Sequence, residues 1–151
     1  MVKSFDFGRA PAHLIRRAHQ LSVSLFMEEA ADFGVTPVQF AMLNALIDDP
    51  GQDQVTLASR VAFDAATSGS VIARLESKGW VRREADEQDR RRKRLWITTA
   101  GQAVAQQIKR PASHTQERLV APLSRAEQEQ LVELLAKLVA AHETPPTISS
   151  S

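Results

Sequence analysis

A run of five adjacent cations is the strongest chemical signal in this sequence. The run is Arg90-Arg91-Arg92-Lys93-Arg94, and the polar residues Asp86 to Asp89 precede it. Like charges at such short separation repel one another, so stability of the chain does not explain them. Guanidinium and ammonium groups bind phosphate oxygens, and arginine also enters the strongly negative, narrow minor groove of DNA. The run therefore indicates a surface for a polyanion, although an isolated charged run is usually only a solvated loop.

Asp89 suggests how one of these cations is oriented. It lies two residues before Arg91, so its carboxylate could accept a hydrogen bond from the Arg91 guanidinium across the loop. A pre-oriented Arg91 would suit the minor groove. We then expect Arg90, Arg92 and Lys93 to meet the flanking phosphates.

A second group of polar side chains lies just upstream, at helical spacing within residues 64–79. Val71, Ile72 and Leu75 form its apolar side. Small hydroxyl residues on the opposite side would let a helix enter a groove deeply, and longer cations would reach phosphates. The alternative is an ordinary solvated helix. The candidate DNA-binding residues of this helix are Thr67, Ser68, Ser70, Arg74 and Lys78.

The elements around these residues predict a winged helix-turn-helix. A short helix over about 57–62, after Thr56 as N-cap, precedes a helix over about 65–78 that begins after Asp64. Two apolar-containing runs, Trp80–Ala85 and Leu95–Thr98, then flank the charged tip as a β-hairpin. Such a unit places one helix in the major groove of DNA and a basic loop against the backbone or minor groove. The fold class is mainly α with a small hairpin wing.

Helices also dominate the rest of the chain. Apolar spacing predicts a helix over 12–33 that ends at Gly34. Pro111 should kink or break the helix that follows the hairpin, because proline lacks an amide donor and clashes with the preceding turn. Three capping boxes mark further helix starts, at Thr36–Gln39, Thr99–Gln102 and Ser124–Glu127.

The two ends of the chain favour a homodimer. Each has a long helix with an apolar stripe, which a small winged-helix unit is unable to cover alone, and two-fold symmetry suits a pseudo-palindromic DNA operator. The alternative is that these helices pack only on their own chain. The expected organisation is an N-terminal dimerisation helix region over 1–35, a DNA-binding winged helix over 36–99, C-terminal dimerisation helices over 100–144 and a disordered tail over 145–151.

Composition excludes several classes of function. The net charge is only +1, but 74–94 carry nine cations and five anions, whereas 124–151 carry two cations and four anions. No apolar run approaches the roughly 18 residues of a membrane span, and no secretory signal is evident, so we expect a cytoplasmic protein without a membrane partner. The chain has no cysteine, its histidines lack metal-ligand spacing, and no catalytic motif is present. We expect neither metal nor cofactor, and no enzyme activity.

Several motifs resemble the MarR (multiple antibiotic resistance regulator) family over about 11–143. They are the wing Asp86–Arg91 with Leu95–Gly101, the helix end Arg74–Val81 and the helix start Thr36–Phe40. The resemblance implies a dimeric winged-helix transcription regulator, usually a repressor, often relieved by small aromatic or phenolic ligands. It also implies a wing role for Asp89 and Arg91. Many members have Thr-Arg where this chain has Gly69-Ser70, so the operator sequence is open.

A small-molecule effector would lie between the terminal helices and the DNA-binding lobe in similar proteins. An arginine or histidine beside phenylalanine rings would suit an aromatic carboxylate. The alternative is that the rings are plain core and the cations are solvated. A winged helix used for protein contacts, without ligand response, is the alternative function. The candidate ligand-binding residues are His13, Arg16, Arg17, His19, Phe26, Phe40 and Asn44.

Overall fold

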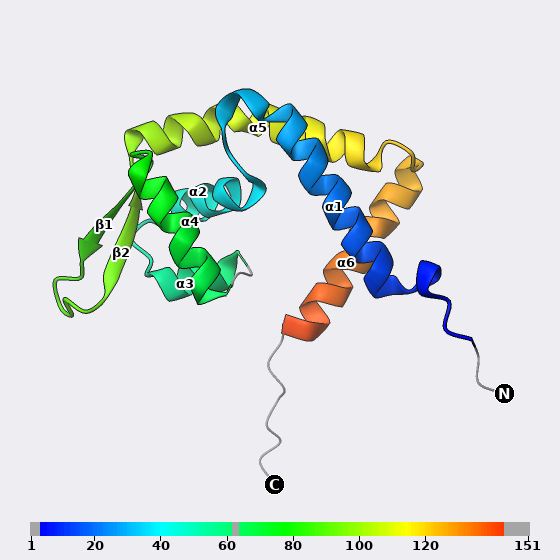
Figure 1. The fold of residues 1–151 in the computed structure, drawn as a ribbon, viewed down its shortest axis with the longest axis horizontal. Helices are drawn as coiled ribbons and strands as arrows, with labels where there is room; N and C mark the ends of the chain where they lie inside the picture. Colours follow the sequence, from blue (N-terminus) through cyan, green and yellow to red (C-terminus); the bar gives the residue numbers. More distant parts are fainter. Residues whose placement is uncertain (1–3, 62–63, 144–151) are drawn as a thin grey trace, which may run out of the picture.

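The computed structural model describes residues 4–61 and 64–143, which form α-helices and one antiparallel hairpin (Figure 1). The mainly α winged-helix fold expected from the sequence is confirmed. Two short 3-10 turns, Phe7–Arg9 and Ala31–Phe33, flank the first helix. The regular elements are α1 Pro11–Glu29, α2 Pro37–Asp48, α3 Gln54–Arg60, α4 Ala65–Ser77, β1 Val81–Ala85, β2 Lys93–Ile97, α5 Thr99–Val120 and α6 Arg125–Glu143.

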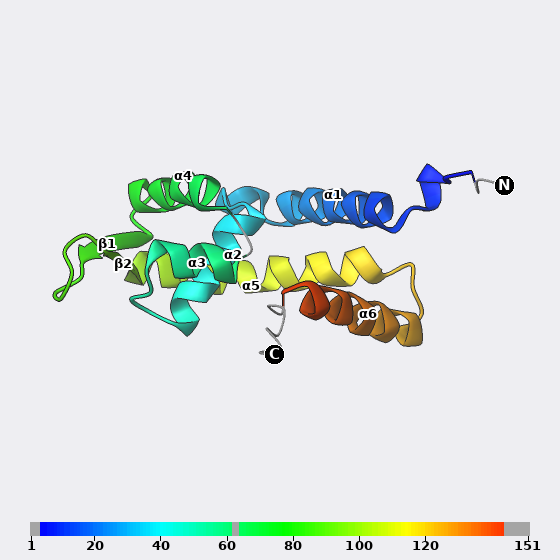
Figure 2. The same ribbon diagram turned by 90° about the horizontal axis from the view of Figure 1, so that it is seen from below.

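The elements form a compact lobe with an extended arm. Helices α2, α3 and α4 gather beside the hairpin, while α5 leads away from it and the C-terminal part of α1 packs on α5 (Figure 1). In the view turned by 90°, α1 and α6 lie on opposite sides of α5 (Figure 2). Helix α5 therefore connects the lobe to the helices expected to form a dimer.

Two apolar clusters hold this arrangement. The larger cluster joins Met42, Leu46 and Leu57 with Ile72 and Leu75, and so fastens α2 and α3 to α4. The smaller cluster joins α1 to α5 through Phe26 and Ile108. Trp80 and Val104 pack against both clusters, and burial of this kind is the main favourable contribution to folding. The position of the lobe on α5 is thus set by side-chain packing.

Helix starts agree with the sequence at three positions and differ at two. The boxes at Thr36 and Ser124 have both reciprocal bonds, and Asp64 caps α4. The prediction that Thr56 caps α3 is wrong: Asp53 Oδ1 accepts from the Thr56 amide at 2.8 Å, so α3 begins three residues earlier than expected. The cap of α5 is Thr98, not Thr99, because Thr98 Oγ1 accepts from the Gly101 amide at 3.0 Å.

Helix α5 runs through Pro111 without a break, from Thr99 to Val120. The predicted break is therefore wrong. Pro111 itself is half-buried, and Ile108 and Ala112 near it belong to the Phe26 cluster. The first helix also ends earlier than expected, at Glu29, and a 3-10 turn leads to Gly34 in the left-handed conformation with φ 60°. The end of the predicted helix at residue 62 and the tail 145–151 lie outside the described residues.

The hairpin pairs Val81 with Ile97 at its base and Ala85 with Lys93 near its tip. Its second strand begins earlier than expected, so Lys93 and Arg94 belong to β2 and not to the tip. The loop after α2 pairs with the outer side of β2, because Gly51 and Gln52 exchange backbone hydrogen bonds with Leu95 at 2.9 Å each. This backbone pairing fixes the hairpin to the lobe.

An ionic cluster ties the end of α1 to α5. Arg118 donates to Glu29 at 2.7 Å and to Glu28 at 3.1 Å, and His114 Nδ1 lies 2.8 Å from Glu29 Oε2. Hydrogen bonds from His114 and then from Arg118 lower the pKa of Glu29. A carboxylate with a lowered pKa contributes stability that is lost as the pH falls through that pKa, so acid should loosen this link.

Candidate nucleic-acid interface

Helix α4 presents one apolar and one polar face. Ile72 and Leu75 are fully buried, whereas Thr67, Ser70 and Arg74 are exposed. Asp64 begins the helix by accepting from the Thr67 amide and from the Thr67 hydroxyl, both at 2.8 Å, and these bonds lower the pKa of Asp64. The Thr67 hydroxyl therefore uses its proton within the chain and offers only lone pairs to a ligand.

Ser68 is not on the exposed face, contrary to the sequence prediction. Its relative exposure is 0%, and its Oγ has no hydrogen-bond partner among the described residues. The reason is helical periodicity: Ser68, Ile72 and Leu75 follow one another at spacings of four and three, so they share the buried face. Ser68 is therefore unavailable for a base contact in this structure.

The two cations of α4 differ in their surroundings. The Arg74 side chain has no acidic partner in the described parts of the chain and points from the exposed face. Lys78, just beyond the helix, donates to the Gly34 carbonyl at 2.6 Å and lies 4.5 Å from the centre of the Trp80 ring. Arg74 is thus freer than Lys78 to meet a phosphate.

The wing tip is a built turn, not a loose loop. The Arg92 amide donates to the Asp89 carbonyl, and the Asp86 amide donates to the Arg92 carbonyl, each at 3.0 Å. Asp89 Oδ1 accepts from the Arg91 backbone amide at 3.0 Å. The expected bond from Asp89 to the guanidinium is therefore wrong, because the carboxylate is used to close the turn two residues on.

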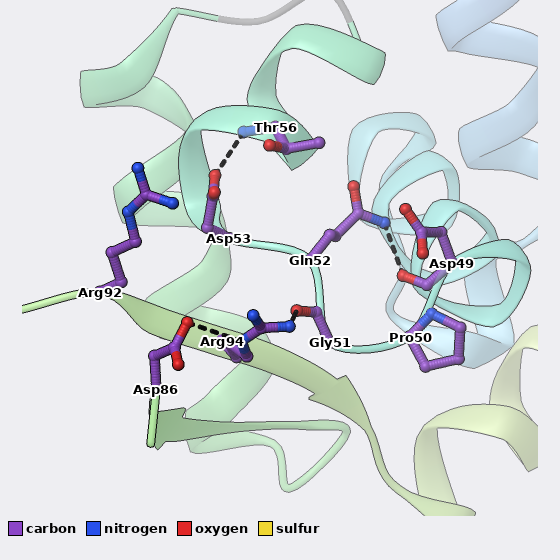
Figure 3. A pocket seen from close by; sticks show the side chains of 9 residues that line it. All are labelled: Asp49, Pro50, Gly51, Gln52, Asp53, Thr56, Asp86, Arg92 and Arg94. Atoms are coloured by element: carbon purple, nitrogen blue, oxygen red, sulfur yellow. Dashed lines mark hydrogen bonds and ion pairs between the residues drawn. The ribbon is translucent and has the colours of Figure 1, made fainter. Parts of the chain in front are cut away.

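Asp86 provides the ion pair that the sequence reasoning assigned to Asp89. Its carboxylate accepts from Arg94 Nε at 2.9 Å, across the hairpin, and Arg94 also donates to the Gly51 carbonyl at 3.3 Å (Figure 3). The Gln88 amide and then the Arg94 guanidinium lower the pKa of Asp86. Asp86 was missed because the pairing needs the hairpin register: eight residues separate the two side chains along the chain.

A polar hollow of about 260 Å³ separates the wing from the loop after α2. Arg92 and Arg94 line one side, and Asp49 and Asp53 line the other (Figure 3). The hydrogen bond from the Thr56 amide is the main cause that lowers the pKa of Asp53, and the nearby charge of Arg92 lowers it further. Of the five adjacent cations, Arg92 and Arg94 thus face acidic groups of their own chain. Arg90, Arg91 and Lys93 are exposed with no acidic partner among residues 4–61 and 64–143.

The candidate ligand-binding residues do not form one cluster within a protomer. The His13 ring packs against the Phe7 ring in a tilted arrangement, with ring centres 4.4 Å apart, and His13 Nδ1 lies 3.3 Å from Arg16 Nη2. Phe26 lies much further along α1 and faces Phe40 of α2, with ring centres 5.9 Å apart. Asn44 of α2 donates to the Phe40 carbonyl at 2.8 Å. Arg17 and His19 are exposed on α1 between these groups. At 1.5 Å per residue, His13 and Phe26 are about 20 Å apart along the helix.

The structure also bears on metals and membranes. Among the described residues, no histidines or carboxylates are grouped so as to hold a metal ion. No helix within those residues combines the length and apolar character needed to cross a bilayer.

A hydroxyl-lined helix beside a cationic hairpin defines a winged helix-turn-helix DNA-binding protein, and comparison with known proteins agrees. The sequence pattern of the MarR family matches residues 33–92. The transcriptional regulator HosA of Escherichia coli O157:H7 is 32% identical over 127 residues, which cover 84% of this chain and 93% of HosA. The chain therefore belongs to the MarR family, a family of transcriptional regulators and not of enzymes.

Two solved structures extend the likeness over nearly the whole fold. BpsR of Bordetella bronchiseptica, studied for regulation of its DNA binding by 6-hydroxynicotinic acid, is 30% identical with a TM-score of 0.85, covering 91% of this chain and 98% of BpsR. The transcriptional repressor CouR, bound to a 23-mer DNA duplex, is 25% identical with a TM-score of 0.82, covering 92% of this chain and 99% of CouR.

Proposed function

We propose that this transcriptional regulator is a cytoplasmic homodimeric repressor that binds a pseudo-palindromic operator and releases it when a small aromatic acid or phenol binds. The observation that carries the proposal is the free polar surface at one end of the protomer. Thr67, Ser70 and Arg74 on α4 are exposed there. Arg90 and Arg91 on the wing are also exposed, and neither has an acidic partner within the part of the chain that the structure describes. The alternative is a winged helix that contacts an acidic protein.

The chemistry of each side chain decides whether it would contact bases or phosphates of the DNA. Ser70 and the Thr67 oxygen are short enough to lie at base edges, which specify sequence. Arg74 and the wing cations Arg90 and Lys93 would contact phosphates, which position the protein. Arg91, at the closed turn, would enter the minor groove. Asp89 is assigned a supporting role, through the backbone of Arg91.

The homodimer is proposed from apolar surface that the single chain leaves uncovered. Leu21 of α1 is 57% exposed, and Leu135 and Leu138 of α6 are 40% and 45% exposed. Helix α6 contributes no buried residue to the protomer. Apolar stripes of this length usually mark a protein interface, and a second copy would supply matching helices by two-fold symmetry.

Titration of operator duplexes at several salt concentrations tests the DNA-binding face. Arg74→Ala should weaken binding about equally on all sequences and reduce the slope of log affinity against log salt by about one, because one phosphate contact is lost. Ser70→Ala is the control within the same helix: it should alter sequence preference and leave the slope unchanged. A wild-type protein that binds duplex without sequence preference would favour the protein-contact alternative.

The ligand response is proposed from two observations. BpsR, a structural relative, has its DNA binding regulated by 6-hydroxynicotinic acid, an aromatic carboxylic acid. In this chain the aromatic pair Phe26 and Phe40 lies where α1 and α5 meet the lobe, and Asn44 is half-buried beside it. His13, Arg16, Arg17 and His19 lie on α1 and could reach an effector only where a second copy brings α1 near such a pair.

Calorimetric titration of an aromatic acid, with and without operator duplex, tests this response. An effector must bind with different affinities to the arrangement of the protein that can bind DNA and to the arrangement that cannot. If the acid releases the operator, the operator must weaken the acid by the same factor. Hydroxybenzoic and hydroxynicotinic acids are suitable probes, and cyclohexanecarboxylate is a control for charge without an aromatic ring. Equal affinities in the two titrations would remove the ligand from the proposed mechanism.

A further inference from the structure

Gln54 joins three elements at the edge of the candidate DNA-binding face. It is the first residue of α3 and is half-buried. Its Oε1 lies 3.5 Å from Arg83 Nη1 of β1, and Arg83 Nε in turn donates to Glu76 of α4 at 2.5 Å. This chain of contacts links the wing, α3 and α4, and it fixes which end of the Gln54 amide faces Arg83.

The other end of the amide rests on α4 at Gly69. A Cβ added at Gly69 would lie 3.1 Å from Gln54 Nε2, which is tighter than an ordinary contact. Gly69 is not among the glycines with positive φ, so the helix backbone does not require glycine there. Glycine is also unfavourable within a helix. The close approach of Gln54 is the physical reason that the structure offers for a glycine at this position.

The Gln54 Nε2 donor is unused within the described chain. No described residue accepts a hydrogen bond from Gln54 Nε2. This atom is also absent from the fully buried polar atoms that lack a partner, so it is not fully buried. Gln54 also lines a hollow of about 470 Å³ between the start of α3 and the wing, together with Thr56 and the cations Arg91, Arg92 and Lys93. Asp53 also lines this hollow, but its carboxylate is engaged by the Thr56 amide at 2.8 Å.

We propose that Gln54 is a positioning residue for α4: its Nε2 donates to a phosphate of the DNA backbone in this hollow, and Gly69 leaves the space that the amide needs. The inference rests on the proposed binding of operator DNA by α4 and the wing. Because Gln54 is neutral, its contact releases no counterion, and its loss should leave the salt slope unchanged. This distinguishes Gln54 from Arg74.

A double-mutant cycle on operator affinity, measured by fluorescence anisotropy, tests the proposal. Gln54→Ala and Gln54→Met should each weaken binding roughly tenfold, as expected for one hydrogen bond to a charged group, at unchanged salt slope. Gly69→Ala should raise the midpoint of thermal unfolding, because alanine favours helix, and yet weaken operator binding. In Gln54→Ala/Gly69→Ala the second substitution should have no further effect on affinity. Gln107→Ala, an exposed amide on α5, is the control.

The outcomes separate this inference from the proposed interface. If Gln54→Met bound the operator as tightly as the wild type while Arg74→Ala bound it more weakly, the role of Gln54 would be overturned and the proposed interface would stand. If Arg74→Ala also kept the operator affinity and the salt slope of the wild type, both the proposed interface and the inference about Gln54 would be wrong. Additive effects of Gln54→Ala and Gly69→Ala would overturn the seating of the amide on Gly69.

Discussion

Leu135→Asp is expected to convert the protein from a dimer to a monomer or to insoluble material, and to lower operator affinity sharply. Leu135 is 40% exposed in the protomer, on the apolar side of α6. In a dimer, this substitution would place a carboxylate in an apolar seam, at a cost of several kcal/mol. A monomer would contact a single half-site, so the binding energy of the second copy of α4 would be lost.

Sedimentation velocity and operator titration measure the two parts of this prediction. Lys137→Asp places the same side chain two residues away, on the other side of α6, and should sediment and bind much like the parent. Circular dichroism establishes whether the Leu135 variant is folded. A parent protein that sediments as a monomer at micromolar concentration would refute the dimer.

Arg91→Ala should weaken specific binding by roughly 1–3 kcal/mol, the range for an arginine that contacts bases. Arg91 is exposed, and among the described residues its guanidinium has no acidic partner, so no ion pair within the chain must break before it binds. The turn closed by Asp89 already fixes its backbone. We therefore expect the loss to be larger on operator than on unrelated duplex.

Asp89 supplies a control for this prediction. Asp89→Ala should weaken binding although it removes a negative charge, because the bond to the Arg91 amide is lost. Asp89→Asn keeps an oxygen acceptor at that amide, so it should bind at least as tightly as the parent. Tighter binding by Asp89→Ala, measured by anisotropy on the same duplex, would mean that the charge matters and the turn does not.

Local sequence rules predicted most element starts, because the residues concerned act within one turn of chain. Thr36 with Gln39, Ser124 with Glu127, and Asp64 each form their expected cap bonds. The same rules chose Thr56 and Thr99 where Asp53 and Thr98 are used. Asp53 and Thr98 also carry side-chain oxygens that can cap a helix. Only the direction of the backbone in the preceding loop decides which of the candidate residues becomes the N-cap.

The wing and helix α4 show which features could not be predicted from the sequence. The order of helix, helix and charged hairpin indicated a winged helix-turn-helix, because short-range periodicity and charge are properties of the chain itself. Which carboxylate pairs with which arginine depends on the hairpin register, which places Asp86 and not Asp89 beside Arg94. Ser68 is an intermediate case, since its spacing to Ile72 already placed it on the buried face.

The sequence alone thus determined the class of fold, the polar side of α4 and the basic wing, since these follow from residue type and spacing. The tertiary structure decided which of the charged and polar groups are free. Contacts between distant segments engage Lys78 with Gly34 and Arg94 with Gly51, and seat Gln54 against Gly69. Only packing of the lobe brings such groups together, because each contact joins residues 15 to 44 positions apart.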